Sequence, residues 1–362
     1  MKQLSETPGQ PVEVGATKIV FKLLNDASTA CERLSKPNDE EALHDFRVSV
    51  RRLRTFLKSY RPYLATRPAR KAGKRLAGLM KRTNTGRDDQ VHVQWLREQL
   101  ARQRISKTER AGAEMMLREI EQKPEQINGD TINKIADHFR KIRDSLRMQF
   151  DPRLQTSRLN ERGMVRDFAS ATGHLIRGEN QKLTGRLAQI RSIHDQEAAH
   201  QARLAAKRVR YLIEPVRKQV PTGTETVRQL KGLQDLLGQM HDLDVLESTI
   251  GTVIEREALD WSQYVRNSAT GRTNGTVIRQ SSPQLDACHA LAAVLKRANL
   301  RQRTLFKALE KRWIGQTPQS FFARIDRIVR YLDPQSSQAL AASPPSEVSQ
   351  STPSLSPTES TG

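Results

Sequence analysis

Two segments of the chain carry the same pattern of histidine, arginine and lysine at fixed spacing. His44 to Arg54 and His200 to Arg210 both read His-x-x-Arg-x-x-x-[Arg/Lys]-Arg-x-Arg, and the second begins 156 residues after the first. An arginine guanidinium holds two oxygens of a phosphate at once, while a lysine ammonium supplies a mobile point charge. The repeated pattern therefore predicts cations arranged for binding phosphate, twice in one chain.

Both segments are expected to be helices with one buried face. At about 100° per residue, the basic residues of the first copy fall within roughly 80° of one another, and Lys58 extends the row. An apolar stripe lies directly beside them: Phe46, Val50, Leu53 and Leu57. Because a surface helix packs its apolar stripe on the core, the cations are expected at the margin of a packed face.

The remaining sequence reads as further helices separated by proline and glycine, and no strand pattern is found. The second half repeats the order of the first, since Leu230-Lys231-Gly232-Leu233 follows Leu76-Ala77-Gly78-Leu79 by 154 residues. The predicted fold is all-α, with two four-helix units related by internal duplication. The expected helices cover about residues 14–34, 39–61, 69–82, 104–121, 131–150, 160–191, 194–218, 224–259, 285–313 and 321–332.

Polar segments flank this helical body. Residues 1–12 contain two prolines and a glycine, and Ser, Pro, Thr and Gln dominate residues 333–362. Both ends are expected to be disordered. The predicted domain therefore spans residues 13–332, with a first half of about 13–152 and a second half of about 158–332.

The charge of the chain indicates an anionic partner. The sequence has 61 Lys and Arg against 40 Asp and Glu, a formal net charge of +21, and its last basic residue is Arg330. Such a body repels itself unless a polyanion offsets the charge. The alternative is a solubilising surface, which would normally mix both signs along each face. A phosphate-rich partner is the favoured interpretation.

Cysteine content and hydropathy limit the setting. Cys31 and Cys288 are too few for a disulfide framework or a multi-cysteine metal site, and are expected as buried thiols in a reducing cytosol. The N-terminal residues lack the apolar core of a signal peptide, and no apolar run approaches membrane-spanning length. A cytoplasmic protein without a membrane partner is predicted.

The repeated helix and the segment that follows it resemble the CHAD family, whose name denotes a conserved histidine α-helical domain. The resemblance rests on His44 to Arg54, Leu76 to Val91, His200 to Arg210 and Leu230 to Val245, and it covers about residues 12–332. It implies two antiparallel four-helix bundles with pseudo-twofold symmetry around a basic groove. It also implies binding of inorganic polyphosphate and association with polyphosphate granules.

The resemblance and the basic spacing together predict the residues of the groove. Lys207 departs from the family pattern where the first copy has Arg51, and this change keeps the charge. No catalytic residue, metal or cofactor is expected, because the chain lacks the triphosphate-tunnel domain that precedes some such modules. The predicted polyphosphate-binding residues are His44, Arg47, Arg51, Arg54, Lys74, Arg75, Lys81, Arg82, His200, Arg203, Lys207, Arg210, Lys231, Arg303 and Lys307.

Two roles stay open for several of these side chains. His44 and His200 either donate to phosphate, more strongly when protonated near pH 6, or hydrogen-bond a neighbouring helix. Arg52 and Arg208 lie about 80° from their histidines and either contact ligand or brace the bundle through carboxylates. Asp88 and Asp242 are interpreted as such bracing partners.

A metal-dependent phosphohydrolase is the enzymatic alternative. It would use the His-Asp pairs at 44–45, 194–195 and 241–242 to hold a divalent metal. Such sites need several carboxylates in one pocket, whereas arginines surround His44 and His200. The second copy also has Gln201 where the first has Asp45. A binding role is therefore preferred.

Nucleic acid or an acidic protein partner at a granule would also explain the charge. Against nucleic acid stand the absence of recognition motifs and the scarcity of aromatic residues. Trp95, Trp261 and Trp313 are expected to pack rather than to stack on bases. Weak nonspecific binding of DNA or RNA is still expected, since a cationic groove attracts any polyanion.

Overall fold

The computed structural model describes residues 9–36, 39–64, 67–83, 87–122, 129–150, 166–270, 282–315 and 319–334. Within these ranges the secondary structure is helical and contains no strand, so the predicted all-α class is confirmed. Most of the two ends predicted to be disordered lies outside the described residues. None of the described helices is long and apolar enough to cross a membrane.

The helices follow the predicted order with several shifted boundaries. α8 begins after Asp167 rather than near residue 160, residues 160–165 lie outside the described residues, and α10 continues past the expected end near residue 259. Helix α4 is not among those expected. The helices are α1 (Val12–Arg33), α2 (Glu40–Ser59), α3 (Arg67–Thr83), α4 (Arg87–Leu100), α5 (Lys107–Glu121), α6 (Gly129–Gln149), α8 (Phe168–Leu187), α9 (Gln196–Ile213), α10 (Gly223–Ala269), α11 (Pro283–Leu309) and α12 (Gln319–Leu332).

Local sequence explains where several helices begin. The Ser106 hydroxyl accepts from the Glu109 backbone N–H at the start of α5, and the Asp167 carboxylate accepts from Ser170 N–H at the start of α8. Ser282 does the same for α11, with proline at the first helical position. These side chains satisfy N–H groups that lack a partner in the first turn of a helix.

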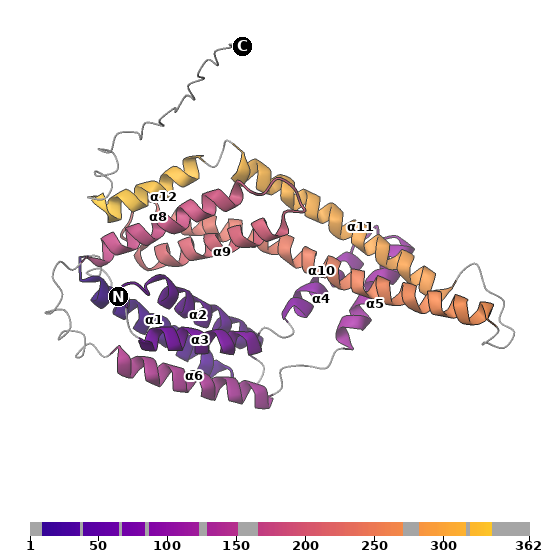
Figure 1. Cartoon of the computed structure of the whole chain (residues 1–362), viewed down its shortest axis with the longest axis horizontal. Coiled ribbons are helices and arrows are strands. Elements are labelled where there is room, and N and C mark those ends of the chain that lie inside the picture. The colour runs from indigo at the N-terminus through magenta and orange to yellow at the C-terminus, as the bar shows by residue number, and fades with distance from the viewer. Residues whose placement is uncertain are drawn as a thin grey trace, which may run out of the picture.

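Helices α1, α2, α3 and α6 pack around a shared apolar interior, at the lower left of Figure 1. The predicted apolar stripe of α2 faces this interior, since Phe46, Val50 and Leu53 are fully buried. The Phe46 ring meets the Phe139 ring of α6 edge-on at 5.2 Å between centroids. The period of apolar residues therefore predicted the buried face of this helix correctly.

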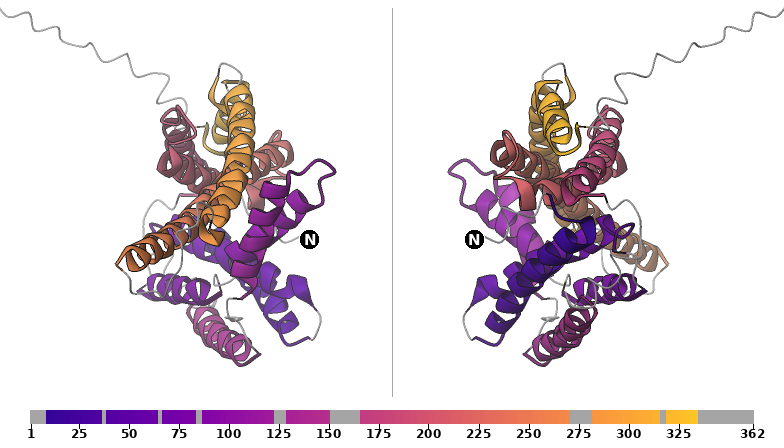
Figure 2. Two further views of the ribbon diagram at one scale, coloured as in Figure 1. Left: turned by 90° about the vertical axis from the view of Figure 1, so that its right-hand side faces the viewer. Right: turned by 90° about the vertical axis from the view of Figure 1, so that its left-hand side faces the viewer.

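Helices α8, α9 and α12 form a second group with the N-terminal part of α10. The end views in Figure 2 separate this group from the first. Tyr60 at the end of α2 links the two groups, because its hydroxyl lies 2.6 Å from Thr172 Oγ1 of α8 and its ring stacks on Phe168. Burial raises the pKa of the Tyr60 hydroxyl, so it stays protonated and available as a donor.

The rest of the helices form a third group, which projects to the right in Figure 1. It consists of α4 and α5 from the first half with α11 and the C-terminal part of α10 from the second. Arg256 of α10 forms two hydrogen bonds with the Glu119 carboxylate of α5, at 2.9 and 3.0 Å. Two four-helix units therefore do not account for all the helices, because this group draws on both halves.

The body extends slightly beyond the predicted domain limits. The Gln10 carbonyl accepts a hydrogen bond from the N–H of Phe168, the first residue of α8, and Val12 N–H donates to the Arg166 carbonyl just before it. Asp333, expected in the tail, is buried and accepts a hydrogen bond from the Ser170 hydroxyl at 3.1 Å. Residues 10–12 and 333 thus belong to the packed helices.

Most of the predictions for cysteine and tryptophan hold. Both thiols are free, Cys31 is buried, and Cys288 is only partly buried, which corrects the expectation for Cys288. Trp313 is buried and Trp95 packs partly against the core. Trp261 instead stacks on the neighbouring Tyr264 at 5.5 Å between ring centroids.

Helices α5 and α11 lie so close at Gly112 that one added methyl group should destabilise the protein. A Cβ at Gly112 of α5 would lie 2.2 Å from the Ala290 carbonyl oxygen of α11, so Gly112→Ala must push the helices apart. We expect a loss of about 1–3 kcal/mol in the free energy of unfolding, measured by denaturation followed by circular dichroism.

Gly78→Ala is the matched control, because no atom lies within 4 Å of a Cβ at Gly78. In that helix alanine should stabilise the protein by up to about 1 kcal/mol. Equal stability of the two variants would contradict the tight contact between α5 and α11.

Candidate functional site: a basic cleft between two helix groups

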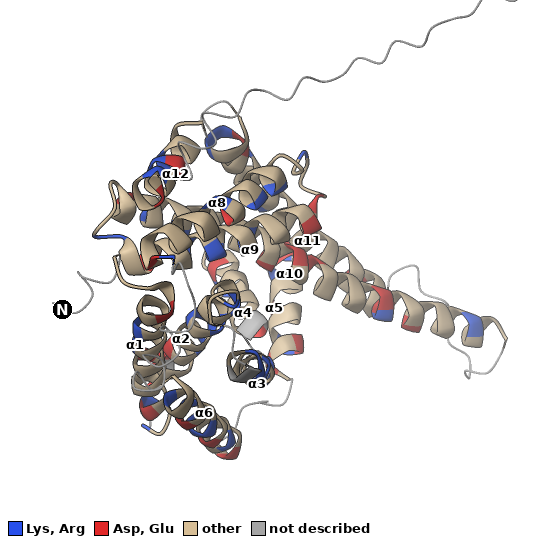
Figure 3. Cartoon of the chain, turned by 60° about the vertical axis from the view of Figure 1, so that its left-hand side comes forward, with Lys and Arg blue, Asp and Glu red and all other residues tan. Residues whose placement is uncertain are grey.

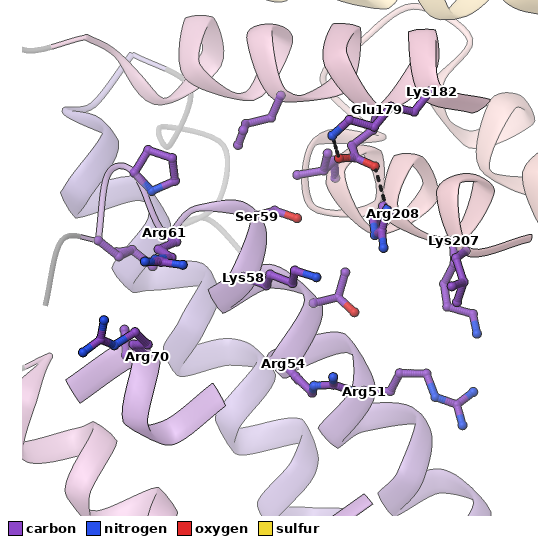
Figure 4. Close-up of a pocket in the computed structure, with 17 residues that line it drawn as sticks. Arg51, Arg54, Lys58, Ser59, Arg61, Arg70, Glu179, Lys182, Lys207 and Arg208 are labelled. Carbon is purple, nitrogen blue, oxygen red and sulfur yellow. Dashed lines mark hydrogen bonds and ion pairs between the residues drawn. The ribbon is translucent and has the colours of Figure 1, made fainter. Parts of the chain in front are cut away.

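A cleft of about 1320 Å³ lies between the first two helix groups. Helices α2 and α3 form one wall, and α8 and α9 form the other. Among the described lining residues, Glu179 is the only acid, and the basic residues are Arg51, Arg54, Lys58, Arg61, Arg70, Lys182, Lys207 and Arg208 (Figure 4). The two walls therefore present an excess of positive charge to the space between them.

The cations of the first wall follow from the periodicity of α2. Arg51, Arg54 and Lys58 are three or four residues apart, so they share one side of the helix next to its buried stripe. Arg61 follows in the turn after the helix, and Arg70 comes from the start of α3. Arg54 and Lys58 are exposed while Arg51 is half-buried, so the row runs from solvent towards the second wall.

Lys207 of α9 is the electrostatic centre of the second wall. Its pKa is lowered from 10.5 to about 7, first because the side chain is buried and second because the positive charges of Arg51, Arg203 and Arg210 are close. Arg51 belongs to α2, so this cluster of like charges spans both walls. A bound anion would relieve the repulsion and favour the protonated ammonium.

Carboxylates hold the edges of the cluster. Glu214, just after α9, lies 3.5 Å from Arg52 Nε and 3.3 Å from Arg210 Nε. Glu179 lies 2.7 Å from Lys182 Nζ and 3.4 Å from Arg208 Nη1. The bracing role proposed for Arg52 and Arg208 is therefore the one observed, although Arg208 also lines the cleft.

Three of the predicted site residues, Arg51, Arg54 and Lys207, line this cleft. Arg203 lies beside it, with its guanidinium about 3.3 Å from where a Cβ of Gly238 would stand, so the glycine permits this approach to α10. Arg210 is held by Glu214 and lies over the Tyr211 ring at 4.9 Å. Arg203 and Arg210 thus do not line the cleft, but their positive charges help to lower the pKa of Lys207.

The residues near the start of each repeated helix lie elsewhere. Arg47 is only 7% exposed, and neither it nor the half-buried His44 lines the cleft. His200 lines another hollow, of about 790 Å³, where its ring lies 5.1 Å from that of His241. Asp244 also lines this hollow, and burial raises the pKa of its carboxyl group to about 7.

The other predicted residues are exposed on the outer faces of three helices. Lysine and arginine positions are spread over many helices in this way (Figure 3). None of these residues lines the cleft, and Arg303 instead borders a hollow of about 330 Å³ between α10 and α11. They are Lys74, Arg75, Lys81 and Arg82 on α3, Lys231 on α10, and Arg303 and Lys307 on α11.

The cleft also contains cations that were not predicted. Arg61 continues the spacing of Arg54 and Lys58, so the sequence held a signal for it. Lys182 belongs to a helix without a repeated motif, and Arg70 lies in the first turn of α3; neither has such a signal. The Asp88 side chain, which was predicted to brace the bundle, lies outside the described residues. The described residues contain no group of three His, Cys, Asp or Glu side chains placed to hold a metal ion.

The comparisons with known proteins identify the family and the fold of the chain. The model of the CHAD domain matches residues 18–251, well over half of the chain. The chain belongs to the CHAD domain family. The crystal structure of the CHAD domain from the plant Ricinus communis matches with a TM-score of 0.52 and 18% sequence identity, covering 87% of this chain and 93% of that one. This likeness shows a shared fold, and no curated protein matches the chain.

The charge of Lys207 should make the stability of this CHAD domain depend on pH. Between pH 7 and 10.5 the folded state binds fewer protons at Lys207 than the unfolded chain, so stability rises with pH across that interval. Lys207→Met removes the buried charge. We expect it to stabilise the domain more at pH 6 than at pH 9.5 in chemical denaturation.

Lys231→Met, on an exposed face away from the cleft, is the control and should show no such difference. Equal effects of Lys207→Met at both pH values would show that the ammonium is not in a repulsive environment.

Proposed function

We propose that this CHAD domain binds inorganic polyphosphate in the basic cleft. The observation that carries the proposal is the pairing of two cationic walls, with Arg51 and Lys207 close enough for their charges to interact and one acid among the lining residues. Membership of the CHAD family, which is linked in general to polyphosphate binding, supports it. The proposed role is binding, with no catalytic residue assigned.

The chemistry of the polymer suits such a cleft. Polyphosphate carries a negative charge on every unit and has no base edges, so a binder needs many cations rather than a few shaped contacts. Cations one to two helical turns apart on α2 offer such a series, and those of α8 and α9 face it. Binding by release of counterions should then weaken steeply with added salt, as for nucleic acids.

We further propose that the two halves arose by duplication and that the cleft lies near their pseudo-twofold axis. The packing supports this, since α1 contacts α2 as α8 contacts α9, and α2 contacts α3 as α9 contacts α10. Leu76 and Leu79 are buried as Leu230 and Leu233 are. The repeated helices α2 and α9 would then present equivalent cations from opposite sides.

The cellular setting remains part of the proposal. A domain that holds the polymer along an open cleft would remain attached to a polyphosphate granule in the cytoplasm, where many chains are present together. Weak binding of DNA or RNA is the second candidate, because the exposed lysines and arginines of α3 would attract any polyanion. The scarcity of aromatic residues at the cleft favours polyphosphate.

A salt-dependent titration with long-chain polyphosphate tests the proposal. We expect Arg51→Ala combined with Lys207→Ala to weaken binding by on the order of tenfold and to reduce the slope of log affinity against log salt by about 1–2. Fluorescence anisotropy of labelled polyphosphate would measure both quantities. Polyphosphate should also displace duplex DNA at equal charge concentration.

Arg303→Ala combined with Lys307→Ala is the matched control, because it removes the same charge from an exposed face outside the cleft. An equal loss of affinity in the control pair would indicate general attraction rather than a cleft. Unchanged binding in the Arg51 and Lys207 pair, or displacement of polyphosphate by DNA, would overturn the proposal.

Glu179 provides a test with the opposite sign. Its carboxylate forms ion pairs with Lys182 and Arg208, two cations that a phosphate group would otherwise contact. Glu179→Gln should therefore strengthen polyphosphate binding several-fold at moderate salt, measured by the same titration. Glu225→Gln removes an acid paired with Arg228 outside the cleft and should leave affinity nearly unchanged. Weaker binding by Glu179→Gln would mean that the carboxylate orients the cations instead of competing for them.

A further inference from the structure

Three lysines line the basic cleft, and their surroundings differ. Lys58 and Lys182 are exposed, and Lys182 Nζ lies 2.7 Å from a carboxylate oxygen of Glu179. Lys207 is partly buried, and the charges that shift its pKa are all those of arginines. Figure 4 shows its side chain extending from α9 into the space between the walls, toward Arg51 of α2. Lys207 thus combines access from the cleft with a desolvated, cationic environment.

This environment leaves much of the Lys207 amine uncharged at neutral pH. With a pKa of about 7, roughly half of it is unprotonated at pH 7. At an ordinary lysine pKa the fraction would be about three in ten thousand. Only the unprotonated nitrogen has the lone pair that attacks a carbonyl carbon, and burial beside other cations is one way in which proteins activate a lysine as a nucleophile.

The opposite wall offers a place for a phosphate group. Arg51 and Arg54 are three residues apart on one side of α2, and both line the cleft across from Lys207. A guanidinium fork holds two phosphate oxygens at once. The cleft, of about 1320 Å³, has room for a small molecule that carries such a group. A phosphate bound by these arginines would bring the group attached to it close to the Lys207 amine.

The other helices around Lys207 supply few acids. Glu179 of α8 is the only carboxylate among the described lining residues, and it pairs with Lys182 and Arg208. Glu214, just after α9, pairs with Arg210. Helix α10 also packs on α9 but contributes no residue to the described lining of the cleft. The cleft therefore keeps a positive potential, which raises the local concentration of anionic reagents.

We propose that Lys207 is a site of covalent acylation by acyl phosphates. The phosphate of the donor lies against Arg51 and Arg54, and the Lys207 nitrogen attacks the carbonyl carbon. An N–C bond forms, the C–O bond to phosphate breaks, and its electron pair leaves on the phosphate oxygen. The nitrogen gives its proton to the released phosphate, so the products are an acylated lysine and inorganic phosphate.

Two features of the step match the cleft. The guanidinium groups that hold the donor also stabilise the negative charge that develops on the departing oxygen. The amide that forms carries no charge, so acylation removes the cation at the centre of the second wall. The effect of that loss on polyphosphate rests on the proposed function, whereas the acylation itself does not.

Brief treatment of the full chain with acetyl phosphate tests the site, with peptide mass spectrometry to follow each lysine. At pH 7 we expect Lys207 to be acetylated at least tenfold faster than Lys182 and Lys231. The rate at Lys207 should level off by about pH 9, while the rates at the exposed lysines continue to rise towards their higher pKa. A rate at Lys207 no greater than that at Lys231 would overturn the proposal.

A neutral donor separates the role of the arginines from that of the amine. p-Nitrophenyl acetate has no phosphate, so its preference for Lys207 over Lys231 should be at least threefold smaller than that of acetyl phosphate. Arg51→Gln should slow acetylation of Lys207 by acetyl phosphate at least fivefold, and Arg303→Gln, on an exposed face, should not change it. A circular dichroism melt checks that both variants fold. Equal preference with the two donors, or an unchanged rate in Arg51→Gln, would overturn the assignment to acyl phosphates.

The consequence for binding is measured separately. The chain acetylated at Lys207, or Lys207→Gln, should bind long-chain polyphosphate several-fold more weakly than the unmodified chain in the anisotropy titration. Unchanged affinity after acetylation would overturn this consequence. Failure of the unmodified chain to bind polyphosphate would instead overturn the proposed function, and the acetylation rates would still decide whether Lys207 is an acylation site.

Discussion

Like charges are held close together where α2 meets α9, and this repulsion is the constraint that the cleft depends on. Arg51 and Lys207 come from different helix groups, and each would be better hydrated if the groups separated. The apolar faces of both helices prevent this, because Leu53 on α2 and Val209 on α9 are fully buried beside the cations. Hydrophobic burial in the helix groups thus maintains an unfavourable charge arrangement that an anion can relieve.

Two carboxylates, Glu179 and Glu214, pair with the cations around Lys207 and so confine the repulsion to the centre of the cluster. Glu214, just after α9, lies near Arg52 and Arg210, and Glu179 of α8 lies near Arg208 and Lys182, so both acids belong to the second wall. No carboxylate contributes to the shift in the pKa of Lys207. The cations at the edge are therefore fixed in place by partners, while the repulsion that helps to lower the pKa of Lys207 persists in the centre.

Sequence periodicity predicted the buried face of α2 and the cleft residues Arg51, Arg54 and Lys207. It could not distinguish them from Arg47 or His200, because spacing defines an angle around one helix but not which neighbour covers that angle. Arg47 points to a packed side, and α10 encloses His200 in a hollow of its own. The likeness of the two copies therefore did not predict that their matching residues would lie in different environments.

The grouping of the helices was less predictable for a similar reason. Helices α4 and α5 have apolar faces of their own, and a duplicated pattern suggested that each half would pack within itself. They pack instead on α10 and α11, since the second half extends these two helices beyond its own group. Helix lengths, which depend on end signals scattered over many residues, determine this outcome.

Because α10 runs through two helix groups, the number of its residues sets the distance and the rotation between those groups. Its 47 residues form one helix of roughly 70 Å. Its first part packs on α9, and its later part packs on α11 and α4 and reaches α5 through the Arg256–Glu119 pair. No loop separates the two parts. One residue inserted after Gly238 would turn every later contact by about 100° around the axis, and three or four would nearly restore the orientation one turn further along. Loops elsewhere in the chain can vary in length, whereas this stretch tolerates change only in steps of a helical turn.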